Sequence, residues 1–250
     1  MAADIFLVQH HRSDYVVGMS DSALPPQRCR LVLVLTEAHL TALSDTIATH
    51  VGTALCGGDV ASILICQGGV TDIEFQGLLK QLIPVAHEHD VAVIVEGDSR
   101  AAARAGADGL QVPSNLTTAR DAIEQYTPKM MIGIGNVKSR HSALEIGELE
   151  PDYLMFGKAG GDIRPEPHPK NVELGGWWSA MVEIPCIVMG GTDIDAIRSI
   201  ADAGCEFAAL STAIIPPDPD AIAHSDPGEQ VRLANEILDK HAPTFDDEDA

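Results

Sequence analysis

IPCIVMGGTDIDAIRSIADAGCEFAALST, residues 184–212, contains two apolar segments separated by a helical pattern. Residues 184–189 and 206–211 are apolar enough to form strands that are buried on both faces, and residues 193–203 between them predict a helix. Gly204 ends that helix directly before the second strand, as Gly106 does before a strand earlier in the chain. This stretch therefore predicts two parallel strands joined by a helical crossover.

The same strand–helix unit recurs along the chain at nearly regular spacing. Further strands are predicted at residues 30–36, 61–67, 91–95, 108–112, 129–135 and 152–156. Helical patterns lie between and after the strands, for example at 37–50, 117–125, 139–149 and 226–240. Eight such units are the number that closes a barrel of parallel strands.

An open, doubly wound sheet is the alternative architecture. It usually has fewer units and carries a glycine-rich fingerprint after its first strand. Here the first strand is followed by Thr36-Glu37-Ala38-His39, which contains no glycine. The sequence therefore predicts an α/β fold, a single-domain (β/α)8 TIM barrel over residues 30–241, with an N-terminal extension at 1–29 and an acidic, disordered tail at 242–250.

The charge and the cysteine content narrow the class of partner. The net charge of −21 arises from 37 acidic against 16 basic residues, so the surface repels polyanions and we expect no nucleic-acid partner. The five cysteines are odd in number and show no Cys-x-x-Cys spacing, which favours a reducing, cytoplasmic location. The sequence shows no signal-peptide pattern and no apolar stretch long enough to span a bilayer, so no membrane partner is expected, while a homo-oligomer remains possible.

Two loops near the end of the barrel predict a phosphate site. Glycines and a cap residue follow the seventh strand, and hydroxyl residues follow the eighth; the candidate substrate-binding residues are Gly190, Gly191, Thr192, Ser211 and Thr212. Barrels commonly bind phosphate at these two loops, because free backbone N–H groups there face the ligand. A tight turn followed by a helix cap is the structural alternative. The predicted partner is a phosphorylated small molecule.

The loop after the sixth strand, residues 157–170, is long and rich in glycine and proline. It carries three cations in an otherwise acidic chain, and we take Lys158, Arg164 and Lys170 as candidate catalytic residues. Glycine allows motion and cations attract an anionic substrate, so this composition fits a lid; a flexible surface loop is the alternative. His168 is a further candidate for proton transfer.

Four sequence segments together resemble the thiamine-phosphate synthase family, which includes the related thiazole tautomerases. They are residues 107–111, 152–157, 184–191 and 203–214. The resemblance extends over roughly residues 31–215. It implies a TIM-barrel transferase of thiamine biosynthesis that joins a pyrimidine methyl pyrophosphate to a thiazole phosphate and releases pyrophosphate with the help of Mg²⁺. It also implies that Gly190, Gly191, Ser211 and Thr212 form the thiazole-phosphate pocket.

The chain departs from the family pattern on the pyrophosphate side. Only Gln67 stands where the synthases carry a Gln-x-Arg-x-Lys clamp, so it is the substrate-binding candidate there. Glu96 and Asp98 replace an Asn-Asp pair and are the candidate Mg²⁺ ligands, with a strand-end residue and a helix cap as the alternative. Gly135 is a further substrate-binding candidate, at the end of the fifth strand.

The residues after the fifth strand help to distinguish a synthase-like transferase from a tautomerase-like isomerase. Lys138 occupies the position of the tautomerase histidine, and His141 lies one helical turn further on. A solvated helix histidine is expected there, with an acid–base group as the alternative. The synthase-like transferase is therefore the leading prediction. A thiazole tautomerase-like isomerase and a non-catalytic binder of a phosphorylated metabolite remain as alternatives.

Overall fold

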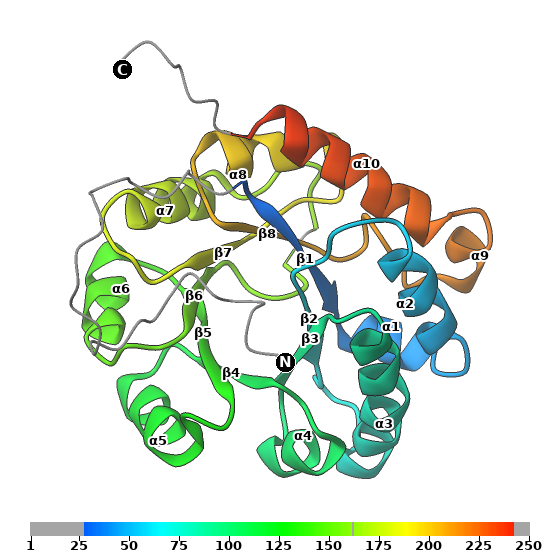
Figure 1. Ribbon diagram of the computed structural model, residues 1–250, viewed down its shortest axis with the longest axis horizontal. Coiled ribbons are helices and arrows are strands. Elements are labelled where there is room, and N and C mark those ends of the chain that lie inside the picture. Colours follow the sequence, from blue (N-terminus) through cyan, green and yellow to red (C-terminus); the bar gives the residue numbers. More distant parts are fainter. Residues whose placement is uncertain (1–27, 162, 243–250) are drawn as a thin grey trace, which may run out of the picture.

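The computed structural model describes residues 28–161 and 163–242, and it contains the predicted closed barrel of eight parallel strands (Figure 1). Each strand pairs with the next in chain order, and β1 also pairs with β8, which closes the ring. The strands are β1 (Arg30–Leu35), β2 (Ser62–Cys66), β3 (Ala92–Glu96), β4 (Gly109–Pro113), β5 (Met131–Val137), β6 (Tyr153–Phe156), β7 (Cys186–Met189) and β8 (Phe207–Leu210).

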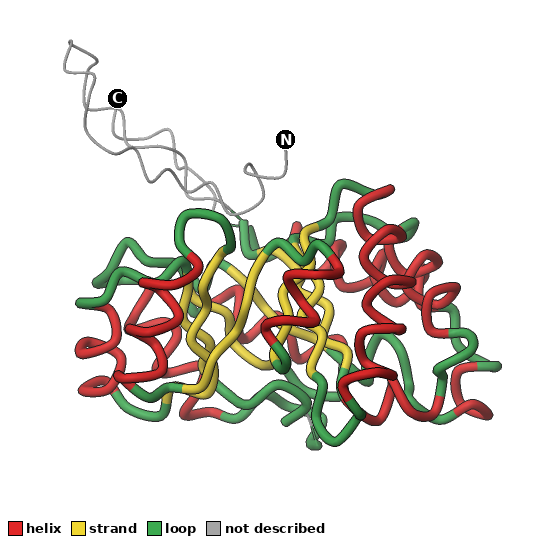
Figure 2. The backbone as a smooth tube through the Cα atoms, turned by 90° about the horizontal axis from the view of Figure 1, so that it is seen from below, coloured by secondary structure: helices red, strands yellow, loops and turns green. Residues whose placement is uncertain are grey.

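Helices surround the barrel in a ring, and the strands occupy the centre when the molecule is viewed from the side (Figure 2). They are α1 (Glu37–Ala42), α2 (Ile47–Leu55), α3 (Asp72–Glu88), α4 (Ser99–Ala105), α5 (Leu116–Tyr126), α6 (Arg140–Gly147), α7 (Pro169–Ser179), the 3₁₀ turn η1 (Ile194–Ile197), α8 (Arg198–Asp202), α9 (Pro219–Ile222) and α10 (Pro227–Lys240). No helix within the described ranges is long and apolar enough to cross a membrane.

Local sequence explains where these helices begin and end. Thr71 caps α3, since its hydroxyl accepts a hydrogen bond from the Glu74 N–H. Gly106 and Gly204 adopt φ angles of +83° and +78°, and each ends its helix before the next strand begins, as predicted.

Two predicted helices were wrong in detail. Residues 37–50 do not form one helix: α1 ends and α2 begins around a turn in which the Thr46 N–H donates to Leu43 O at 2.8 Å. Ser44, Asp45 and Thr46 favour such a turn because their short polar side chains compete for backbone hydrogen bonds. Residues 193–203 begin as the 3₁₀ turn η1 and become α-helical only at Arg198.

The apolar core has two layers. An inner layer fills the barrel with alternate residues of the strands, such as Val32, Leu64 and Met155. An outer layer packs between the strands and the helices. There Trp178 is fully buried against Phe156 and donates from Nε1 to Ile184 O at 2.6 Å, which anchors α7 to the barrel.

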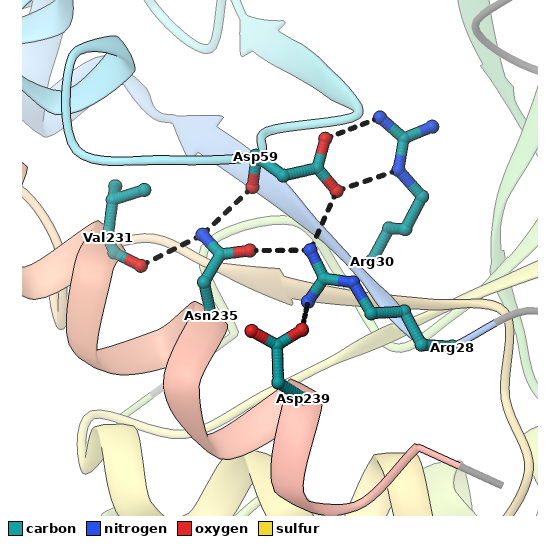
Figure 3. Close-up of polar contacts among 6 residues, drawn as sticks. All are labelled: Arg28, Arg30, Asp59, Val231, Asn235 and Asp239. Atoms are coloured by element: carbon teal, nitrogen blue, oxygen red, sulfur yellow. Dashed lines mark hydrogen bonds and ion pairs between the residues drawn. The ribbon is translucent and has the colours of Figure 1, made fainter.

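A polar network joins the start of β1 to the last helix at the amino ends of the strands (Figure 3). Arg30 binds Asp59 through two hydrogen bonds, of 2.9 and 2.6 Å, and Arg28 reaches Asp59, Asn235 and Asp239 at 2.9–3.0 Å. Asn235 in turn donates to Asp59 O at 3.0 Å. Apart from residues 28, 29 and 242, the predicted extension and acidic tail lie outside the described residues.

Candidate active site at the barrel mouth

A cavity of about 480 Å³ opens at the barrel mouth, the end formed by the carboxyl ends of the strands. It lies between the loop after β6 and the end of β7, and Lys158, Arg164 and Gly190 all line it. His168 lines it as well, although its Nδ1 accepts a hydrogen bond from the Lys170 N–H and so caps α7. Lys170 itself is exposed in the first turn of α7 and does not line this cavity. Two of the three predicted cations thus meet at the mouth.

The loop after β6 crosses the mouth. Ala159 packs against the apolar residues that fill the barrel interior. Gly160 adopts a φ of +70°, and a Cβ atom there would lie 2.6 Å from Thr36 Cγ2 at the end of β1. Only glycine therefore allows the loop to approach β1 this closely.

The same loop is hydrogen-bonded to the predicted phosphate-binding residues after β7. The Thr192 N–H donates to Arg164 O at 2.8 Å, and the Asp193 N–H donates to Pro165 O at 3.1 Å. A Cβ atom at Gly191 would lie 1.9 Å from Pro165 O, so the loop rests directly on this glycine. In this arrangement the loop already occupies the N–H of Thr192, a residue predicted to bind phosphate.

The residues after β8 lie beside this contact. Ser211 is fully buried, and its hydroxyl has no hydrogen-bond partner within the part of the chain that the structure describes. Ser211 O accepts the N–H groups of Ile214 and Ile215 at 3.0 and 3.1 Å, which makes a tight turn after the strand. Thr212 is half-buried in that turn.

His39 connects the loops after β1 and β8. Its Nε2 donates to Ile215 O at 2.7 Å, while its Nδ1 accepts the Thr36 N–H at 3.1 Å. This pair of contacts requires the neutral ring with the proton on Nε2. Burial lowers the pKa of His39, which favours the same neutral form.

Gln67 joins the loops after β2 and β3. Its Nε2 donates to Val70 O at 3.0 Å and to Asp72 Oδ1 at 2.8 Å, and its Oε1 accepts the Asp98 N–H at 2.7 Å. The Asp98 carboxylate accepts the Arg100 N–H at 2.9 Å and caps α4. Both side chains therefore hold loops together in the structure.

Glu96 faces a different direction from Asp98. Its Oε2 accepts a 2.6 Å hydrogen bond from Gln111 Nε2 on β4, and Gln111 Oε1 accepts the hydroxyl of Tyr153 on β6 at 2.9 Å. Neither Gln111 nor Tyr153 was predicted as a site residue. A glutamine inside an otherwise apolar strand was the available signal, because a buried amide needs hydrogen-bond partners.

Gly135 makes room for this group of side chains. A Cβ atom at Gly135 would lie 2.8 Å from Gln111 Nε2. Cys66, on the neighbouring strand β2, is buried in the same region. Burial raises the pKa of its thiol, an effect that Glu96 reinforces and Lys158 opposes, so Cys66 is a neutral packing residue at neutral pH.

The two candidate metal ligands are not brought together, since Glu96 binds Gln111 while Asp98 caps α4. Among the described residues no group of three or more His, Cys, Asp or Glu side chains could hold a metal ion. His141 is 84% exposed and pairs with Glu145, as expected for a solvated helix histidine.

Comparison with known proteins identifies relatives along most of the barrel. Residues 31–214 match the family described as thiamine monophosphate synthase. The chain is 31% identical over 184 residues to the thiamine-phosphate synthase of Rhodospirillum centenum, an alignment that covers 73% of this chain and 87% of the relative. It is 28% identical over 201 residues to that of Hyphomonas neptunium, which covers 78% of this chain and 90% of the relative.

A solved structure supports the same fold. Thiamine phosphate pyrophosphorylase from Pyrococcus furiosus superposes with a TM-score of 0.69 at 22% sequence identity. The match covers 86% of this chain and 97% of the other.

Proposed function

Because the chain belongs to the thiamine monophosphate synthase family, we propose that it is a transferase that joins a pyrimidine methyl pyrophosphate to a thiazole phosphate. In this reaction a bond forms between the thiazole and the methylene carbon of the pyrimidine. The bond from that carbon to pyrophosphate breaks, and pyrophosphate leaves with the bonding electrons. The family match from β1 to beyond β8 carries this proposal.

Lys158 and Arg164 are the groups that meet the departing pyrophosphate. Both line the cavity at the mouth of a chain whose net charge is −21, so a local cationic site is needed to attract an anion. Cations placed where negative charge develops lower the barrier to its formation. Lys170, one residue into α7, attracts the substrate from the rim rather than from the cavity.

The thiazole phosphate binds next to these cations, on the β7–β8 side of the mouth, at Gly190, Gly191, Thr192, Ser211 and Thr212. The buried Ser211 hydroxyl supports this placement, because a buried hydroxyl without a partner costs about 1–3 kcal/mol that a ligand oxygen can recover. The loop after β6 must first leave the Thr192 N–H, so it acts as a lid, with Gly157 and Gly160 at positive φ as its flexible points.

Glu96 is the residue that would hold Mg²⁺. Mg²⁺ in phosphate-binding sites is commonly held by one or two carboxylates together with phosphate oxygens, so a single glutamate fits this role while Asp98 stays with α4. When bound there, the ion would neutralise part of the charge of pyrophosphate. Gln67 and Gly135 support the site indirectly, through loop contacts and by making space.

The test is turnover of the two substrates by the purified chain, with thiamine phosphate measured by chromatography. We expect product formation that requires Mg²⁺. Lys158→Ala and Arg164→Ala should each lower kcat/KM by about 100-fold, the scale of losing one group that stabilises developing charge. Lys80→Ala, at an exposed position on α3, is the matched control and should keep wild-type activity.

Two results would contradict the proposal. One is wild-type protein that binds thiazole phosphate in a calorimetric titration but forms no thiamine phosphate; it would leave an isomerase or a binder of a phosphorylated metabolite. The other is full activity in both cation variants, which would remove Lys158 and Arg164 from the site.

A further inference from the structure

A chain of hydrogen bonds runs beneath the barrel mouth from β6 to β3. Tyr153 donates to Gln111 Oε1 at 2.9 Å, and Gln111 Nε2 donates to Glu96 Oε2 at 2.6 Å. Tyr153 and Gln111 are 0% and 3% exposed, whereas Glu96 is half-buried. The chain therefore begins inside the barrel and ends at a carboxylate at the mouth.

Strand β5 lies between Gln111 on β4 and Tyr153 on β6, and its glycines allow these two side chains to touch. Gln111, Gly133 and Tyr153 are in register across β4, β5 and β6. A Cβ atom at Gly133 would lie 1.9 Å from Tyr153 Cζ, so the ring reaches Gln111 only because β5 carries glycine at this position. Gly135 leaves space for the amide of Gln111 in the same way. Because β5 carries glycine at both positions, the side chains of Tyr153 and Gln111 can meet across it.

The direction of the hydrogen bonds fixes which atom of Gln111 faces Glu96. A phenol has one proton to donate, and burial raises the pKa of Tyr153, so this hydroxyl stays protonated. A donor at Tyr153 requires the amide oxygen of Gln111 to face it. The amide nitrogen then faces Glu96 and donates to its Oε2 in a short hydrogen bond of 2.6 Å.

The carboxylate of Glu96 is thereby held by one of its two oxygens. Within the described ranges, the hydrogen bond to the Glu96 side chain is accepted by Oε2, and Oε1 accepts none. The neighbouring Cys66 thiol is neutral, because burial and the charge of Glu96 raise its pKa while the charge of Lys158 lowers it. The second oxygen of Glu96 is therefore left for a cationic ligand at the mouth.

We propose that Gln111 and Tyr153 are positioning residues that fix Glu96 so that Oε1 meets the Mg²⁺–pyrophosphate end of the substrate. This rests on the proposed function for the identity of the ligand, but the hydrogen-bonded chain can be tested separately. Neither residue touches substrate; each acts through Glu96. The role belongs to the pyrophosphate half of the site and leaves the thiazole-phosphate half unaffected.

The test compares Tyr153→Phe, which removes one oxygen atom, with Tyr126→Phe. The Tyr126 hydroxyl also makes a 2.9 Å hydrogen bond, to Ser99 Oγ, but at the helix side of the barrel. Calorimetry measures the binding of pyrophosphate with Mg²⁺ and, separately, of thiazole phosphate to the full chain. We expect Tyr153→Phe to weaken Mg²⁺–pyrophosphate binding by about fivefold, the scale of one hydrogen bond, with thiazole-phosphate binding changed less than about twofold.

Gln111→Met keeps the length of the side chain and removes both polar groups, so it should give a loss at least as large. Tyr126→Phe should bind both ligands as the wild type does. Unchanged Mg²⁺–pyrophosphate binding in Tyr153→Phe would overturn the proposal. Equal loss of both ligands would overturn it too, because that result indicates a general structural defect.

A second readout does not depend on substrate. In ¹⁵N-labelled protein the side-chain amide signals of Gln111, assigned by their absence in Gln111→Met, should be shifted by the bond to Glu96, and Tyr153→Phe should remove that shift. Identical amide signals in wild type and Tyr153→Phe would overturn the positioning role. A wild-type chain that binds no Mg²⁺–pyrophosphate but shows the amide shift would contradict the proposed function and leave the hydrogen-bonded chain standing.

Discussion

At the scale of single residues, the contact that His39 makes between the loops after β1 and β8 depends on pH, because it requires the neutral ring. The neutral ring connects Thr36 after β1 to Ile215 after β8, and a protonated ring would place a second N–H against the Thr36 N–H. Because Ile215 belongs to the turn that contains Ser211 and Thr212, protonation should loosen the part of the mouth assigned to phosphate.

This contact predicts a loss of stability in mild acid. The pKa of His39 is below its ordinary value of 6.5 in the fold, so unfolded chains take up the proton first. The contribution of neutral His39 to stability is fully present above pH 6.5 and is lost as the pH falls from there through the lower pKa of the folded state. His39→Gln should lose about 1–3 kcal/mol in denaturant unfolding at pH 7.5 and show a smaller decrease between pH 7.5 and 5.5 than the wild type.

The exposed His89 provides the control for that experiment. His89→Gln should follow the wild-type curve at both pH values. If His39→Gln and the wild type lose stability equally between pH 7.5 and 5.5, another group is responsible for the acid sensitivity.

Residue chemistry also shows what sequence could and could not predict about the site. Lys158, Arg164 and Gly190 were predicted from loop composition, and they line one cavity. Gln111 and Tyr153 were missed because their partnership depends on which residues of β4, β5 and β6 lie in register. That register is set by the closure of the barrel, so no local segment of the sequence determines it.

At the scale of elements, the loop after β6 is held by two kinds of contact, main-chain hydrogen bonds at β7 and close packing at β1. The strands were predictable because each is an apolar run, whereas the position of this loop was not. Its glycines and prolines indicate a defined shape, but contacts with Thr36 and Gly191 arise only once distant strands share one barrel end.

The packing of Gly160 gives a prediction about the lid. Gly160→Ala introduces strain at φ +70° and a Cβ atom 2.6 Å from Thr36 Cγ2, so the loop should leave its position over the mouth. We expect cleavage of the loop by protease to become about tenfold faster, because cleavage follows the population of the open form. The KM for pyrimidine substrate should rise as well.

Gly204→Ala is the matched control, since Gly204 has a φ of +78° and a Cβ atom there would have no neighbouring atom within 4 Å. It should lower stability by about 1 kcal/mol without a change in KM or in cleavage of the loop. Equal protease resistance of Gly160→Ala and wild type would show that packing on Thr36 does not hold the loop.

At the scale of the whole molecule, the barrel is closed by β1 pairing with β8 and by the network of Arg28, Arg30, Asp59 and Asn235 (Figure 3). The hydrogen-bonded guanidinium of Arg30 holds the pKa of Asp59 below its ordinary value of 3.8. This carboxylate therefore contributes stability above pH 3.8, and the contribution is lost as the pH falls through the lower pKa of the folded state.

Asp59→Ala should consequently destabilise the chain by about 1–3 kcal/mol at pH 7, and the difference from wild type should shrink below pH 4. Denaturant unfolding at pH 7, 5 and 3.5 measures this. Asp121→Ala, at an exposed position on α5, should unfold like the wild type. A difference that stays constant from pH 7 to 3.5 would mean that the Asp59 charge does not matter.

The ion pair between Arg28 and Asp239 has a topological consequence, because it joins a residue just before β1 to one in the last turn of α10, through side chains that meet at 3.0 Å at the end of the barrel opposite the mouth. A short peptide joining these points would turn the barrel into a covalent ring that could be reopened at another loop as a circular permutant. A carrier protein or a solid support attached at this end of the barrel would lie on the side opposite the substrate entrance. The barrel could thus be tethered in series with other enzymes while its entrance stays open to solution.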